Sequence, residues 1–123
     1  MMRARAVAML ALMALTTAAC GSEPDALRLE DAAAPGADLS FTIPAGAGEA
    51  YDRGEPLEVL PGELSVVVGD VIEIVNEDDR GHLVGPFFVG AGETLRQRFA
   101  SPGEFVGICT VHPSGELVLV VNE

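Results

Sequence analysis

The chain has 123 residues and a formal net charge of −12, from 19 acidic residues against 7 Arg, and it contains no Lys. The lack of any basic cluster excludes a nucleic-acid-binding surface and a polybasic membrane patch, and a hydrophobic fraction of 49 % excludes an acidic disordered protein. Two Cys and two His are too few for a multicopper oxidase, a binuclear dithiolate copper centre or a disulfide-rich scaffold.

The first 19 residues have the features of an export signal. Arg3 and Arg5 precede an apolar or small-residue run over residues 6–19, which is shorter than the about 20 residues that a helix needs to cross a bilayer. This pattern predicts a secretory signal peptide over residues 1–19. The small residues before Cys20 resemble a bacterial lipoprotein signal, which implies a lipidated Cys20 and a membrane anchor. Thr17 replaces the usual Leu, so cleavage without lipidation stays an alternative, as does a buried N-terminal helix.

Removal of residues 1–19 would also change the composition. It removes two Arg and no acidic residue, which takes the net charge from −12 to −14, and it removes all four Met. Residues 20–38 are rich in Ala, Pro and acidic residues, and we expect a lipidated N-terminus and a flexible tether there. A short helix over residues 25–33 is an alternative, because Ala, Leu, Arg and Glu favour helices.

From residue 39 the pattern becomes that of short strands. Alternating or β-branched runs between Gly and Pro turns predict strands at 39–43, 57–60, 64–68, 71–75, 94–99, 104–109 and 116–121, and one more strand split by Gly85-Pro86 into 82–84 and 87–89. Residues 45–56 and 76–81 are expected to be loops. About eight short strands with frequent turns predict one all-β sandwich over residues 39–123.

Three side chains in this region carry metal chemistry. Cys109 and His112 are three positions apart in a tight turn between the last two strands, and His82 follows the loop 76–81. In a sandwich, these two loops can meet at one end. One thiolate and two imidazoles are the trigonal ligand set of a blue copper site, in which the soft thiolate stabilises Cu(I). The spacing therefore predicts a copper-binding site at His82, Cys109 and His112.

The segment from Pro102 to Pro113 resembles the C-terminal copper loop of the cupredoxins, especially the plastocyanin and amicyanin branch. The spacing from Asn76 to His82 and the sequence Val68-Gly69-Asp70 are also similar, so the resemblance covers about residues 57–122. It implies a cupredoxin-like Greek-key β-sandwich and an exported carrier of single electrons with one type 1 copper ion. The implied roles are a buried ligand for His82, a covalent thiolate for Cys109 and a ligand at the solvent edge for His112.

The chain departs from that family at three places. No Met is left for the weak axial position, where the alternatives are Leu117 as a shield, the Gly81 carbonyl and the Glu116 carboxylate. Leu83 replaces the Asn that usually follows the first His, so the hydrogen bond across the two loops is lost or comes from another residue such as Thr110. Gly107 replaces an aromatic residue.

A redox protein partner is expected to dock near His112. Four residues predict an apolar collar there: Leu83, Pro86, Phe87 and Pro113. Adjacent strand residues face opposite ways, so only one of Phe87 and Phe88 is expected to pack inward. The negative charge favours a basic partner. The acidic run 77–79 lacks the alternating spacing of a calcium loop and is interpreted as a solvated turn.

Three alternatives to an electron carrier stay open. The same ligands fit a copper-trafficking protein of the cell envelope, and a domain without metal would act as an interaction module. Zn²⁺ held by His82, Cys109, His112 and Glu116 is the third. No enzyme motif is apparent, since the chain has no Lys-ended phosphate loop and a Ser–His–acid set would need the same two His.

Overall fold

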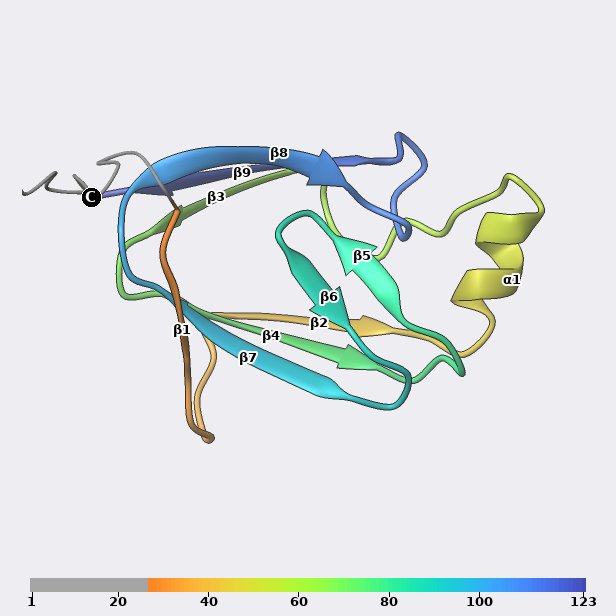
Figure 1. Cartoon of the computed structure of the whole chain (residues 1–123), viewed down its shortest axis with the longest axis horizontal. Helices are drawn as coiled ribbons and strands as arrows, with labels where there is room; N and C mark the ends of the chain where they lie inside the picture. Colours follow the sequence, from red (N-terminus) through yellow and green to blue (C-terminus); the bar gives the residue numbers. More distant parts are fainter. Residues whose placement is uncertain (1–26) are drawn as a thin grey trace, which may run out of the picture.

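The computed structural model describes residues 27–123 and confirms the all-β prediction (Figure 1). Within these residues the chain forms nine strands and one short helix. The strands are β1 (Leu29–Asp31), β2 (Leu39–Ile43), β3 (Glu63–Val67), β4 (Val71–Asn76), β5 (His82–Val84), β6 (Phe87–Val89), β7 (Thr94–Phe99), β8 (Gly103–Ile108) and β9 (Glu116–Asn122). The helix is α1 (Ala47–Asp52).

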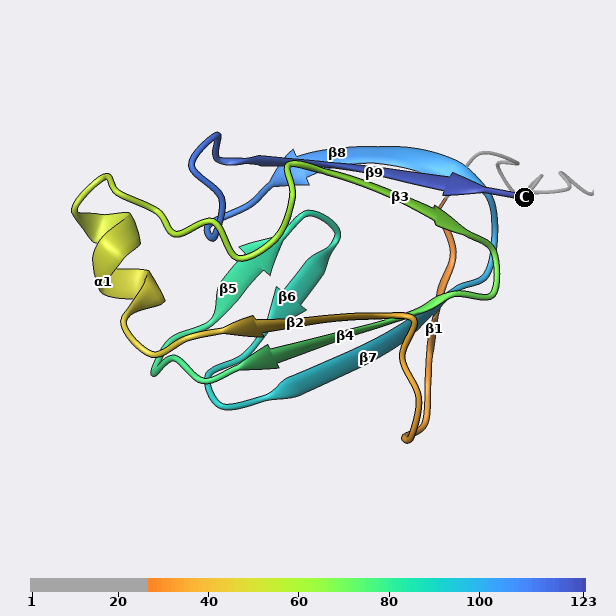
Figure 2. The same ribbon diagram turned by 180° about the vertical axis from the view of Figure 1, so that it is seen from behind.

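The strands form two main layers. One sheet has the order β1-β7-β4-β2, and the other has the order β3-β9-β8. Figures 1 and 2 show the hairpin β5-β6 between these layers and α1 at one end of the molecule. The pairs β2–β4 and β3–β9 are parallel and the others antiparallel, so the chain crosses between the layers as it passes from β2 to β3 and on to β4. The sandwich is therefore of mixed type.

Every second side chain along the strands points inward, and these side chains fill the space between the layers. In β9, Leu117, Leu119 and Val121 are buried, while the residues between them face outward. Phe87 is buried and meets the ring of Phe99 edge-on, with 6.2 Å between the ring centroids. The next residue, Phe88, is 63 % exposed, which confirms that only one of the two adjacent Phe packs inward.

Residues 29–31 form strand β1 instead of the expected tether or helix. Leu29 pairs with Phe99 and Asp31 with Gln97, so β1 lies antiparallel along one edge of β7. A strand of three residues gives no alternation that a sequence pattern can reveal. The free backbone groups at the edge of β7 supply the hydrogen bonds, and the helix alternative is wrong at these residues.

The segment 45–60 also differs from the prediction. Helix α1 lies in the expected loop, where Ala47 and Ala50 pack their small side chains into the core. It starts after Gly46, whose φ of 90° suits only glycine well. The predicted strand at 57–60 is wrong. This stretch has one isolated backbone hydrogen bond, from the Val59 N–H to the carbonyl of Val111 in the turn between β8 and β9, 2.9 Å away, and no ladder forms.

The predicted signal peptide and Cys20 lie outside the described residues. Across residues 27–123, no helix is both long enough and apolar enough to span a bilayer.

Candidate metal centre

The structure brings the segment of His82 beside the segment of Cys109. Val84 and Cys109 form an antiparallel bridge that joins β5 to the residue after β8. The Gly85 N–H donates to the Ile108 carbonyl at 2.8 Å, and the Thr110 N–H donates to the Leu83 carbonyl at 2.9 Å. The two predicted loops therefore meet at one end of the sandwich.

His82 is buried and has a hydrogen-bond partner at each ring nitrogen. Its Nε2 lies 2.7 Å from Asp78 Oδ2, and its Nδ1 lies 2.8 Å from Thr110 Oγ1. An ionised carboxylate only accepts hydrogen bonds, so Nε2 carries the hydrogen. In the neutral ring the lone pair is then on Nδ1, which faces the hydroxyl of Thr110, the residue after Cys109. Metal-binding His side chains commonly have this arrangement, with a carboxylate on the other nitrogen.

Asp78 is the most important residue of this site that the sequence did not indicate. Its side chain is buried and also accepts hydrogen bonds from the Gly46 N–H at 3.1 Å and the Gly48 N–H at 2.8 Å. The hydrogen bond from His82, helped by these backbone donors and opposed by burial, holds the pKa of Asp78 well below its usual range. The prediction of a solvated acidic turn is wrong for Asp78, although Asp79 is exposed.

Asn76 and Arg80 fix the shape of the loop that leads to His82. Asn76 Nδ2 lies 2.9–3.1 Å from the carbonyl oxygens of Arg80, Val89 and Gly90, and its Oδ1 accepts the Asp78 N–H at 3.0 Å. The Arg80 guanidinium donates to the Asp52 carboxylate of α1 at 2.8 Å. The loop is therefore held to both the hairpin β5-β6 and helix α1.

Cys109 is a free thiol with no exposed surface. Burial raises the pKa of the Cys109 thiol, and a hydrogen bond from the Val111 N–H partly offsets this by favouring the thiolate. The backbone of the turn is closed by the Cys109 N–H, which donates to the Gly115 carbonyl at 2.9 Å. The sulfur is thus held at the inner side of the turn, among core residues.

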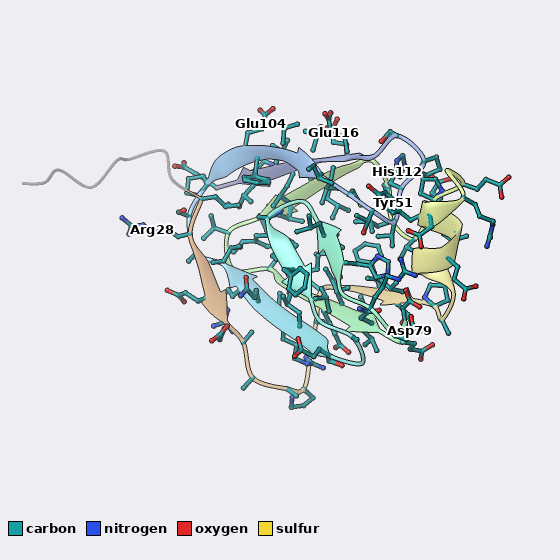
Figure 3. The ribbon with its side chains drawn as sticks, turned by 45° about the vertical axis from the view of Figure 1, so that its right-hand side comes forward. Arg28, Tyr51, Asp79, Glu104, His112 and Glu116 are labelled. Atoms are coloured by element: carbon teal, nitrogen blue, oxygen red, sulfur yellow. The ribbon has the colours of Figure 1, made fainter. Side chains whose placement is uncertain are left out.

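His112 lies in the same turn, at the end of the molecule where α1 is also found (Figure 3). Its side chain is 16 % exposed, and Nε2 lies 3.7 Å from Glu58 Oε1. Nδ1 accepts the Ser114 N–H at 3.0 Å and lies 2.7 Å from Ser114 Oγ. The ring covers Gly62, where an added Cβ would lie 3.2 Å from His112 Cε1. As in His82, the lone pair is on Nδ1 in the neutral ring.

The donor atoms fit copper in kind but are not gathered around one point. Within residues 27–123, no group of three or more His, Cys, Asp or Glu side chains is placed so that it could hold one metal ion. The Nδ1 atoms of His82 and His112 instead contact the hydroxyls of Thr110 and Ser114. The ligand set of one thiol and two imidazoles therefore stays a prediction, supported by the chemistry of the donors.

The three axial alternatives lie in different surroundings. Leu117 is fully buried and packs on Gly85, where an added Cβ would lie 2.8 Å from Leu117 Cδ2. Glu116 is exposed, and Figure 3 shows it on the outer side of β9. Gly81 is half-buried, and the ring of Phe88 fills the space where its Cβ would be. This placement favours Leu117 as the shielding residue.

At Leu83 and Gly107, where the sequence departs from the cupredoxin pattern, neighbouring residues take over the missing contacts. Thr110 Oγ1 lies 3.3 Å from the Leu83 carbonyl, so Thr110 supplies a side-chain link across the two loops where Leu83 has none. A Cβ on Gly107 would lie 2.5 Å from Phe105 Cε1. The space for an aromatic residue at position 107 is therefore taken by the ring of Phe105.

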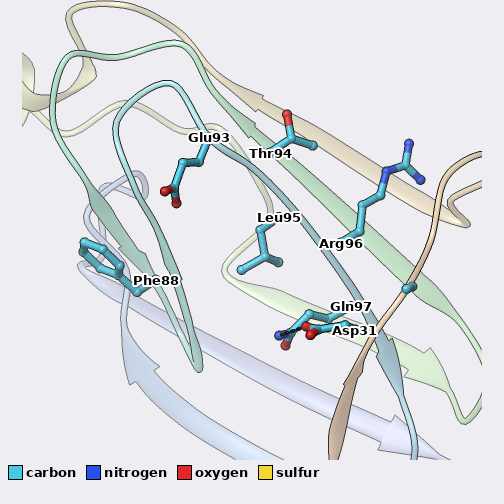
Figure 4. A pocket seen from close by; sticks show the side chains of 8 residues that line it. Asp31, Phe88, Glu93, Thr94, Leu95, Arg96 and Gln97 are labelled. Carbon is cyan, nitrogen blue, oxygen red and sulfur yellow. Dashed lines mark hydrogen bonds between the residues drawn. The ribbon is translucent and has the colours of Figure 1, made fainter.

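A shallow pocket of about 380 Å³ lies elsewhere, beside β1, β6 and β7 (Figure 4). Its lining residues are Asp31, Ala32, Phe88, Glu93, Thr94, Leu95, Arg96 and Gln97. None of the predicted metal ligands is among them, so this pocket is separate from the candidate centre.

No protein-family model matches the chain, and no curated protein sequence matches it. Among solved structures, the chain is similar to a purple cupredoxin from Nitrosopumilus maritimus, with 22 % identity over 69 % of this chain and 100 % of that chain and a TM-score of 0.45. It is also similar to amicyanin from Paracoccus versutus, with 17 % identity over 72 % and 85 % and a TM-score of 0.46. A reduced Cu(I) form of an amicyanin mutant has 19 % identity over 81 % and 100 %, with a TM-score of 0.45.

Proposed function

We propose that the chain is an exported type 1 copper protein that carries single electrons between redox partners, with His82, Cys109 and His112 as the ligands. The observation that supports this best is the buried pair of Asp78 and His82, whose Nε2 and Oδ2 atoms are 2.7 Å apart. It fixes the hydrogen on Nε2 and leaves Nδ1 as a donor atom beside the Cys109 turn.

Both hydroxyls that contact the two imidazoles have a second acceptor nearby. Thr110 Oγ1 is 3.3 Å from the Leu83 carbonyl, and Ser114 Oγ is 3.1 Å from the Glu116 carbonyl. When a metal takes the Nδ1 atoms, each hydroxyl can therefore donate to a carbonyl instead. Thr110 is half-buried and Ser114 exposed, so metal binding at these nitrogens leaves neither hydroxyl without a partner, and this lowers the free-energy cost of binding.

Cys109 would complete the ligand set. Burial raises the pKa of the Cys109 thiol and the Val111 N–H offsets this only in part, but a bound metal displaces the thiol proton. Copper, when bound, supplies a one-electron couple between Cu(II) and Cu(I). The protein's own contribution is to hold His82 on the hairpin β5-β6 and Cys109 and His112 in the turn between β8 and β9, so that little rearrangement accompanies the change of charge.

The proposal includes the cellular location and the partner. A signal peptide over residues 1–19 and a lipid on Cys20 would place the protein at the outer face of the cytoplasmic membrane or in the periplasm. The redox partner would dock near His112. Phe87 is buried and does not belong to the apolar collar there, whereas Leu83 is 40 % exposed and does.

Addition of Cu(II) to the purified, reduced protein tests the proposal. We expect an intense blue absorption band and the narrow copper hyperfine splitting of a type 1 site in the EPR spectrum. If no such band forms while the Cys109 thiol is shown to be reduced, the protein is not a type 1 copper carrier.

Copper trafficking is the second candidate, and one observation favours it. Both Nδ1 atoms are hydrogen-bonded and the three donors are not gathered, which suits a site that opens for exchange. Copper that passes to a chelator within seconds, without a reversible redox couple, would support trafficking.

A domain without metal would show the same thermal stability with and without copper, because a ligand that binds only the native state must raise its stability.

The axial position leads to a prediction for the reduction potential. Leu117 offers no donor atom, so less electron density stabilises Cu(II), and we expect a higher potential than in Met-ligated relatives. Leu117→Met should therefore lower the potential measured by redox titration. Leu119→Met, at an equally buried position on the same face of β9, is the matched control and should leave it unchanged. Equal potentials for both variants would contradict a role for residue 117.

A further inference from the structure

The outer face of the sheet β3-β9-β8 carries large apolar side chains. Ile108 is 60 % exposed, Val106 52 % and Val67 46 %. All three belong to the outward-facing positions of their strands, since their neighbours Leu64, Val66 and Phe105 pack toward the core. Contiguous exposed apolar surface of this kind marks an interaction site in a soluble protein.

The strand register joins these residues into one surface. Val106 lies directly opposite Val118, and Val120 follows on the same outward face of β9. Val67 lies diagonally from Val120, since Val67 pairs with Asn122. We call this surface the apolar band, and its members are Val67, Val106, Ile108, Val118 and Val120.

Carboxylates border the apolar band, and none of the three strands carries a basic residue. Glu116 pairs with Ile108, Glu104 with Val120 and Glu63 with Val118. Figure 3 shows Glu104 and Glu116 on the outside of β8 and β9. The sequences of β3, β8 and β9 contain no Arg or Lys. The face therefore presents a hydrocarbon centre with charge of one sign around it.

A second copy of the chain would fit this face poorly. It would bring the same glutamates together, and each copy carries a net charge of −12. Like charges placed face to face across an interface weaken association. The charge complement of this surface is instead an apolar ridge flanked by Arg or Lys.

We propose that the apolar band is the docking surface for a basic protein partner with an apolar ridge between its Arg or Lys side chains. This inference does not depend on copper, because it rests on the outer face of the sheet alone. If the proposed function also holds, the band reaches the candidate centre directly, since Ile108 precedes Cys109 in the chain.

Cytochrome c, a basic protein whose lysines surround an apolar haem edge, is a suitable probe. It is titrated into the copper-free, isotope-labelled protein at low salt, and amide shifts are followed by NMR. We expect the shifts to concentrate on β8 and β9. The double variant Val106→Thr with Ile108→Thr keeps β-branched side chains, so the fold is retained, and should weaken binding about tenfold.

Three further variants separate the band from the end of the molecule near His112. Leu83→Thr tests the collar there as the competing docking site, and Tyr51→Gln, at an exposed position of α1 outside both surfaces, is the control that should leave the Kd unchanged. Glu104→Gln with Glu116→Gln should weaken binding at low salt and flatten its salt dependence. The proposal is overturned if cytochrome c does not bind at low salt, if Leu83→Thr weakens binding while the double variant in the band does not, or if the band mediates self-association instead.

Discussion

Cys109→Ser is expected to abolish the blue absorption of the copper-loaded protein. The blue absorption requires a thiolate bound to Cu(II), and Ser offers no soft donor. Loss of a supporting contact around a metal ligand already costs about 10–100-fold in affinity, so loss of the ligand itself should cost more than about 100-fold. Isothermal titration with Cu(II) and the visible spectrum measure the two effects.

In protein prepared without the lipid, Cys20→Ser is the matched control, because Cys20 is then the other thiol of the chain. Cys20 is outside the proposed ligand set, so this variant should keep both the blue band and the copper affinity. Blue absorption that survives in Cys109→Ser, or that disappears only in Cys20→Ser, would refute the assignment of the thiolate ligand.

Asp78→Ala is expected to lower the free energy of unfolding by about 3–5 kcal/mol, because three N–H groups lose their charged acceptor and a buried donor without a partner costs about 1–3 kcal/mol. The change leaves the His82 Nε2–H and the N–H groups of Gly46 and Gly48 without their acceptor. Urea denaturation near neutral pH measures the loss. Asp79→Ala is the control, since Asp79 is exposed and its replacement should change stability by less than about 0.5 kcal/mol.

The same carboxylate makes stability depend on pH. The pKa of Asp78 in the folded protein lies well below its ordinary value of 3.8, chiefly because of the hydrogen bond from His82. The unfolded chain therefore binds this proton first as the pH falls. The contribution of Asp78 to stability is complete above pH 3.8 and is progressively lost below it. In Asp78→Ala that part of the acid dependence should be absent, and an unchanged acid profile would contradict the role given to Asp78.

Strand positions could be predicted wherever alternation and turn residues acted together. The strand over 94–99 and the split pieces 82–84 and 87–89 were obtained with the observed bounds, because Gly85-Pro86 and the flanking loops interrupt a clear apolar pattern. Strand β1 and helix α1 were not obtained. β1 is shaped by the free edge of β7, and α1 has only six residues, too few for a helical period.

The candidate site was predictable to the level of donor types and spacing. The positions of His82, Cys109 and His112 show a recognisable ligand pattern, and the structure brings their segments together. The role of Asp78 could not be predicted, because its backbone partners lie 30–32 residues away, at Gly48 and Gly46. A run of three acidic residues has the same appearance whether one of them is buried or all are solvated.

The attachment of α1 to Asp78 limits how the surface of this protein can be remodelled. Surface loops usually tolerate insertions and deletions, and a protein engineer would choose the stretch between β2 and β3 for a grafted peptide. Gly46 and Gly48 nevertheless direct their N–H groups at the carboxylate behind His82. A graft at 44–50 that displaces these two amides would remove their hydrogen bonds to Asp78 and so disturb the position of the His82 imidazole. A graft at Gly54, after the helix has ended, would leave both hydrogen bonds intact.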